Sequence, residues 1–220
     1  MFTIRVTQLE KFRRYRDSVS SYDTEQSVID GITGDFKGNN YTYIGTAFHN
    51  IVETGNTELF MSEGGAVYMS EEQKQIALDY RNSMPDAFHE IRTKKIYTTP
   101  YGEVEVTGCA DILWGTIIRD IKTKYSQVNQ QDYMDSCQWK FYLELFNTDC
   151  FIFDVFQFHS YDKEKHGLDT RKLKLTKYPN IPCFRYGKME DDNRILLFDF
   201  LDWASHRNLL DNLKFDYDKN

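Results

Sequence analysis

The chain has 220 residues, of which 40% are hydrophobic and 28% are charged, and its formal net charge is −7. This length suits one well-buried core, so we expect a single domain over residues 1–220. The net charge has the wrong sign for a protein that coats nucleic acid, although basic residues form local clusters. The four dispersed cysteines argue against a zinc ribbon, and no apolar run approaches the roughly 20 residues that span a bilayer, so we expect a soluble intracellular protein.

The first quarter of the chain predicts two helices with a loop between them. A helix is expected over residues 7–20, because a Thr-x-x-Glu capping box opens it and apolar residues follow at helical spacing. Residues 21–40 are rich in Ser, Asp, Gly and Asn, which favours a loop. A second helix is predicted over residues 44–54, where His49 and Glu53 are four residues apart and share one face.

The centre of the chain predicts a helix followed by β-structure. A capping box at Ser70 opens the helix and Pro85 ends it. Residues 88–98 have the composition of a strand, and residues 100–102 that of a turn. Residues 103–122 are expected to form a hairpin through the short turn Gly-Thr.

The last part of the chain adds helices and one apolar strand. Residues 129–146 predict one long amphipathic helix, and residues 150–158 are apolar at nearly every position, as in a strand covered on both sides. A basic strand-like stretch over residues 170–177, a proline-containing loop and a helix over residues 190–212 complete the chain. This order predicts an α/β domain with a mixed sheet flanked by helices.

Two carboxylates and one ammonium group stand out on the predicted hairpin. Strand alternation sends Asp120 and Lys122 to one face of the second strand, and the first strand carries Asp111. Aspartate is disfavoured inside strands, so the presence of both aspartates there calls for an explanation. A simple ion pair between Asp120 and Lys122 on a solvated face is one explanation, and a metal site is the other.

Four short motifs follow one another along the chain. They are Gly45-Thr46-Ala47-Phe48-His49, Gly108-Cys109-Ala110-Asp111, Asp120-Ile121-Lys122 and Gln138-Trp139-Lys140-Phe141-Tyr142. Together they resemble the RecB-like branch of the PD-(D/E)XK nucleases, and Thr7 to Phe12 is similar to the opening helix of that branch. The resemblance covers about residues 5–160 and leaves residues 161–220 as a C-terminal extension of strand and helix. It implies a restriction-endonuclease-like core.

The resemblance implies a metal-dependent DNA nuclease, more specifically an exonuclease. Phosphodiester cleavage needs an activated water and stabilisation of the charge on the phosphate, and Mg²⁺ or Mn²⁺ provides both. The implied catalytic residues are Asp111, Asp120 and Lys122, and the implied metal ligands are His49, Asp111, Asp120 and the Ile121 carbonyl. Gln138 and Tyr142 are expected to contact the substrate, and Glu53 is a candidate outer carboxylate.

Departures from the family pattern limit the expected cofactors and partners. The cysteine spacing does not match that of members with an iron–sulfur cluster, so we expect none, and no Walker A motif is present. We expect DNA as the substrate and no association with a membrane. A helicase, a single-strand-binding protein or an annealing protein would be a separate partner. The expected location is the cytoplasm of a bacterial or phage-infected cell. The rival hypotheses are a nucleic-acid- or protein-binding module without cleavage and a structure-specific endonuclease. Recombination, repair or phage DNA processing would be the setting.

Overall fold

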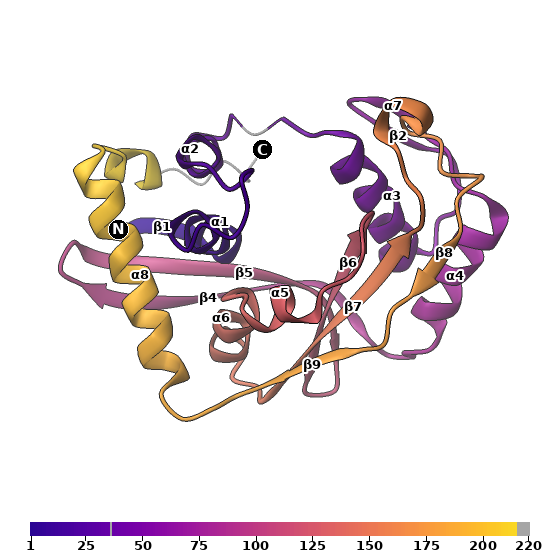
Figure 1. Cartoon of the computed structure of the whole chain (residues 1–220). Helices are drawn as coiled ribbons and strands as arrows, with labels where there is room; N and C mark the ends of the chain where they lie inside the picture. Colours follow the sequence, from indigo (N-terminus) through magenta and orange to yellow (C-terminus); the bar gives the residue numbers. More distant parts are fainter. Residues whose placement is uncertain (36, 215–220) are drawn as a thin grey trace.

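The computed structural model describes residues 1–35 and 37–214 (Figure 1). A seven-stranded mixed sheet lies at its centre with helices packed against it, which confirms the predicted α/β fold class. The strands of this sheet are β1 (Phe2–Arg5), β4 (Phe88–Thr99), β5 (Gly102–Trp114), β6 (Ile117–Lys124), β7 (Cys150–Phe158), β8 (Leu175–Lys177) and β9 (Ile181–Phe184). A separate hairpin consists of β2 (Phe60–Ser62) and β3 (Gly65–Val67).

The helices bury two apolar clusters against the sheet. One cluster lies under α1, α6 and α8, and the other lies under α3 and α4. The helices are α1 (Val6–Arg16), α2 (Glu25–Thr33), α3 (Asn40–Thr54), α4 (Glu71–Asn82), α5 (Gln130–Met134), α6 (Gln138–Leu145), α7 (Lys163–His166), α8 (Met189–His206) and the 3-10 helix η1 (Leu210–Lys214). Within residues 1–35 and 37–214, no helix has the length and hydropathy needed to cross a lipid bilayer.

The strand β5 changes partners along one of its edges. Its other edge pairs antiparallel with β4 over almost the whole strand. On the edge that changes partners, β1 pairs in parallel with residues 104–107, and β6 pairs antiparallel with residues 112–114. Residues 108–111 lie between these two ladders, and Figure 1 shows β6 diverging from β5 toward α3.

The strand β7 changes partners in a similar way. β6 pairs in parallel with it along one edge. On the other edge β9 pairs with residues 150–153 and β8 pairs with residues 156–158, so residues 154 and 155 lie between them. The sheet therefore has two places where an edge passes from one neighbour to the next.

The N-terminal region departs from the sequence prediction in four respects. The residues before the first helix form β1, and the predicted capping box is wrong because α1 begins at Val6, with the Arg5 amide donating to Gln8 Oε1 at 2.8 Å. The helix ends at Arg16 rather than near residue 20. The predicted loop over residues 21–40, of which residue 36 lies outside the described residues, contains α2, because Thr24 caps a helix that buries Val28 and Ile32.

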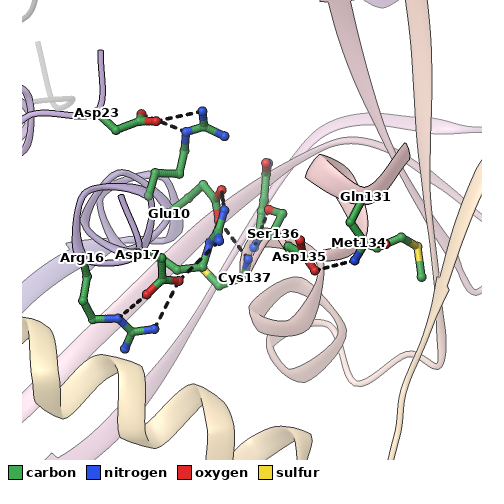
Figure 2. Close-up of polar contacts among 12 residues, drawn as sticks. Glu10, Arg16, Asp17, Asp23, Gln131, Met134, Asp135, Ser136 and Cys137 are labelled. Carbon is green, nitrogen blue, oxygen red and sulfur yellow. Dashed lines mark hydrogen bonds and ion pairs between the residues drawn. The ribbon is translucent and has the colours of Figure 1, made fainter. Parts of the chain in front are cut away.

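The predicted long helix over residues 129–146 is also wrong, because it is divided into α5 and α6. Residues 135–137 interrupt it at the point where α1 packs against this region (Figure 2). The Cys137 amide donates to the Glu10 carboxylate at 2.8 Å instead of continuing the helical hydrogen bonds. A tertiary contact with α1 therefore decides where α6 begins.

The C-terminal third mixes confirmed and corrected predictions. The strand over residues 150–158 is confirmed as β7, whereas the strand-like stretch over 170–177 is extended only at β8. The expected proline loop contains β9, an edge strand in which Pro182 is tolerated because its missing amide is not needed by a second neighbour. The last predicted helix ends at His206, and η1 follows it.

Candidate active site

The candidate site is centred on the gap between β5 and β6. Beyond the pair Ile112 and Arg119 the strand ladder stops, and the Asp111 side chain takes its place: its Oδ2 accepts a hydrogen bond from the Ile121 amide at 2.6 Å. In an extended strand the N–H and C=O of one residue point to the same side, so the Ile121 carbonyl faces the same gap. Asp111 thus joins the two strands where they diverge.

His49 reaches this gap from α3. The helix is anchored by the buried residues Phe48 and Val52, and His49 Nδ1 lies 3.7 Å from Asp111 Oδ2. Burial, and then the charge of Lys122, lower the pKa of His49 to about 4, although contact with the Ile121 backbone opposes this shift. The imidazole is therefore neutral near pH 7, as a metal ligand must be.

Asp120 and Lys122 project into the same region from β6, as strand alternation predicts. Lys122 Nζ lies 2.7 Å from Asp120 Oδ2, and Gln138 Nε2 donates to Asp120 Oδ1 at 2.7 Å. Asp120 is buried with 4% of its side chain exposed, whereas Lys122 keeps 37% and His49 keeps 30%. Solvent, and hence a substrate, can reach the site from the side of Lys122 and His49.

The electrostatics of the site are those of crowded negative charge. Burial, followed by the neighbouring Asp120 carboxylate, raises the pKa of Asp111 well above its usual value. Burial also raises the pKa of Asp120, against the opposing effects of Lys122 and Gln138. Burial opposes the charge on Lys122, but Asp120 and Asp111 raise its pKa, so this side chain is an ammonium ion.

Gln138 and Tyr142 support the site from one face of α6. Both side chains are buried, and the Tyr142 hydroxyl donates to the Cys109 carbonyl at 2.7 Å, on the part of β5 between its two neighbours. Gly108 allows this approach, because a Cβ at that position would lie only 3.0 Å from Leu145 Cδ1. Their contacts here are with Asp120 and with the β5 backbone; substrate contact remains a prediction for both.

Glu53 does not join the cluster in this structure. Its side chain is exposed, and among residues 1–35 and 37–214 it makes no hydrogen bond or ion pair with His49, Asp111 or Asp120. Its backbone carbonyl accepts a hydrogen bond from the Arg81 guanidinium, away from the site. The outer role of Glu53 stays a prediction without a contact to support it.

Glu90 is the carboxylate that the sequence analysis missed. It stands opposite Asp111, between the pairs His89 with Ile112 and Ile91 with Ala110, and its backbone is left-handed with φ of 51°. Its charge contributes to the raised pKa of Asp111, and Cys109 Sγ donates to Glu90 Oε2 at 3.2 Å. A two-residue connection between β4 and β5 fixes this register. Prediction of a β4–β5 hairpin could therefore have placed Glu90 opposite Asp111.

The donor set fits a hard divalent cation. Asp120 Oδ2 is buried, and within the described residues it has no aligned hydrogen bond and forms an ion pair with Lys122. Asp111, Asp120 and the Ile121 carbonyl are oxygen donors of the kind Mg²⁺ prefers, and His49 adds a neutral nitrogen. Among the residues that the structure describes, no group of three or more His, Cys, Asp or Glu side chains is placed so that it could hold a metal ion as it stands. Water or substrate oxygens would therefore have to complete the shell.

Comparison with known proteins gives a likeness of fold alone. No family model and no curated protein matches the sequence. A crystal structure of a phage-related exonuclease from Haemophilus somnus 129PT matches over 93% of this chain and 96% of its own, at 14% identity and a TM-score of 0.47. The crystal structure of SSO0001 matches over 89% of this chain and 76% of its own, at 14% identity and a TM-score of 0.44. At this similarity neither protein bears on the chemistry of the site.

Proposed function

We propose that this chain is a metal-dependent nuclease that hydrolyses phosphodiester bonds in DNA. The observation that supports this most is the meeting of His49, Asp111, Asp120 and Lys122 where β5 and β6 diverge. These four groups come from one helix and two strands, and they include two carboxylates that repel each other unless a cation lies between them. The motif resemblance supplies the reaction class.

Asp111, Asp120, His49 and the Ile121 carbonyl would hold a Mg²⁺ or Mn²⁺ ion. When bound, such an ion supplies Lewis-acid stabilisation of the phosphate and a water of lowered pKa. The raised pKa values of both carboxylates, set first by burial, reflect how costly their charges are without a cation. A bound divalent ion would favour the ionised form of both.

Lys122 would neutralise the substrate phosphate in this arrangement. Its ammonium group is held beside Asp120 and keeps 37% of its side chain exposed, so it can contact a phosphate oxygen without leaving the carboxylate. Its raised pKa, which the two aspartates cause against the effect of burial, argues against proton abstraction by this side chain.

Gln138 and Tyr142 would position the groups that do the chemistry. The Gln138 amide fixes one oxygen of Asp120, which leaves the other for Lys122 and a cation. Tyr142 holds the Cys109 carbonyl and so fixes the backbone two residues before Asp111. Both act through residues of the site.

The test is degradation of labelled linear DNA in a metal series. We expect cleavage with Mg²⁺ or Mn²⁺, none in EDTA, and loss of cleavage in Lys122→Ala while circular dichroism and the unfolding midpoint stay unchanged. Binding of DNA without cleavage at any metal concentration would instead favour the binding module. Cleavage of equal rate in Lys122→Ala would remove Lys122 from the mechanism.

We further propose that the enzyme acts as an exonuclease. Covalently closed circular DNA separates this from endonuclease activity, because a strict exonuclease leaves a closed circle intact and degrades the same DNA after linearisation. Nicking of the circle would establish the endonuclease alternative. The physiological metal follows from the same series, as the ion that gives the higher rate at cellular concentration.

A further inference from the structure

A cavity of about 620 Å³ lies beside the candidate site, against β4 and β5. Residues from the start of α1, from both strands and from α6 line it, and Tyr142 and Cys109 form its boundary toward Asp111. Because Cys109 is also held by Tyr142, the cavity and the site share a wall. None of the proposed roles of the catalytic residues requires this space.

The side chains around the cavity are predominantly cationic. Arg5, Arg92 and Lys94 line it, against one carboxylate, Glu105. Lys94 Nζ pairs with Glu105 Oε2 at 2.7 Å, and Arg5 Nη2 is anchored by a hydrogen bond to the Gly31 carbonyl at 3.1 Å. Arg92 is exposed, and its guanidinium makes no hydrogen bond or ion pair within the described part of the chain, so its five donors remain available.

The first turn of α1 adds to this positive field. Val6 and Thr7 line the cavity, and this turn carries no acidic residue. The unpaired amides at a helix start favour an anion, although this effect is secondary to the three cationic side chains here. A phosphate group matches both the charge and the donors.

Strand geometry sets the distance from this cavity to the site. Thr107 and Cys109 line the cavity, and strand alternation puts them on the same face of β5 as Asp111. At a rise of about 3.4 Å per residue, Cys109 and Thr107 lie about 7 Å and about 14 Å from Asp111 along the strand. One strand of a duplex advances about 3.4 Å per nucleotide along its axis, so the cavity is a few nucleotides from a phosphate bound at the candidate site.

We propose that this cavity binds a phosphate group of the DNA strand being cut, a few nucleotides from the scissile bond, through Arg92 and Lys94. This inference rests on the proposed nuclease function and specifies how that site holds its substrate. The phosphate is either the terminal one or an internal one of the backbone. Arg92 and Lys94 bind it as charges, so each contact contributes to the salt dependence of binding.

The experiment measures binding of a fluorescent single-stranded oligonucleotide in EDTA over a salt series, so that cleavage plays no part. We expect Arg92→Ala and Lys94→Ala each to weaken binding and to reduce the slope of log K against log salt by about 0.7. Glu105→Gln removes the competing carboxylate and should act in the opposite direction, with tighter binding. Lys165→Ala is the matched control, because this exposed lysine lies on α7, far from β1 in Figure 1.

Oligonucleotides with a 5′-phosphate, a 3′-phosphate or only hydroxyl ends separate the two sources of the phosphate. If the variants lose affinity only for one phosphorylated end, the cavity holds that terminal phosphate; if they lose it equally for all three, the cavity holds the backbone. Slopes equal to wild type in Arg92→Ala and Lys94→Ala would overturn the proposal. Because no metal is present, this result is independent of whether the protein cleaves DNA.

Discussion

A buried aspartate lies beside each of the two gaps in the sheet, Asp154 at the gap in β7 and Asp120 at the gap in β5, but the surroundings of these aspartates differ. Asp154 on β7 is fully buried, and both of its oxygens have two partners: Arg119 at 2.8 and 2.9 Å, Lys177 at 2.8 Å and the Tyr80 hydroxyl at 2.7 Å. Asp120 on the neighbouring strand β6 has one hydrogen bond and one ion pair, and it lies near a second carboxylate.

The difference lies in the balance of charge. One carboxylate and two cations surround the gap in β7, whereas Asp111, Asp120 and Lys122 put two carboxylates and one cation beside the gap in β5. A buried charge whose partners are complete holds the fold together, and one whose partners are incomplete has capacity for a ligand. Asp154, for which we expect a structural role, and Asp120, for which we propose a catalytic one, are both buried and so differ in their partners rather than in their exposure.

The largest expected effect is on stability at Asp154. Asp154→Asn leaves the buried guanidinium of Arg119 without its counter-charge, so we expect the free energy of unfolding to fall by about 3–5 kcal/mol. Urea denaturation measures this. The control is Asp169→Asn, which breaks an exposed ion pair with Arg171 and should cost less than about 1 kcal/mol. Equal losses in the two variants would remove the structural role assigned to Asp154.

Asp120→Asn should have the opposite profile, with activity lost and stability kept. Because it removes a ligand charge at the reacting centre, we expect the cleavage rate to fall by about 10³-fold, which corresponds to about 4 kcal/mol of activation free energy. Its free energy of unfolding in EDTA should stay within about 1 kcal/mol of wild type, since mutual repulsion with Asp111 is relieved. A loss of stability as large as that of Asp154→Asn would make Asp120 a structural residue.

Metal binding at the gap in β5 should stabilise the folded protein, whereas the gap in β7 should bind no metal. At a concentration one hundred times the dissociation constant, Mg²⁺ or Mn²⁺ is expected to raise the free energy of unfolding by about 2.7 kcal/mol. Thermal unfolding with and without EDTA measures this shift. The shift should disappear in Asp120→Asn; if it persists there at full size, the ion binds elsewhere.

The smallest effect is expected at Gln138, which positions Asp120. Gln138→Ala removes the hydrogen bond to Asp120 Oδ1, so activity and metal affinity should fall about 10- to 100-fold. Metal titration of the cleavage rate separates affinity from turnover. Gln131→Ala is the matched control, because this glutamine on α5 is exposed and its side-chain amide donates to Asp135, outside the candidate site. A Gln138→Ala variant as active as this control would exclude the positioning role.

Local pattern was sufficient where one property dominates a segment. The apolar run of β7 and the capping box at Ser70 predicted their elements because burial on both faces and a capped first turn depend on neighbours in sequence. Alternation likewise placed Asp120 and Lys122 on one face, where they form an ion pair. The break between α5 and α6 had no such local signal, because Glu10 on α1 takes the Cys137 amide.

For this protein the sequence by itself determined which residues are candidates for the chemistry and, through strand alternation, that Asp120 and Lys122 point the same way. Only the tertiary structure decided that β5 pairs with both β1 and β6, that His49 approaches Asp111 from α3, and that Glu90 stands opposite Asp111. The physical reason is the distance along the chain over which each feature is set. Side-chain direction repeats every two residues along a strand, whereas a gap in a sheet depends on which distant segments pair with each edge.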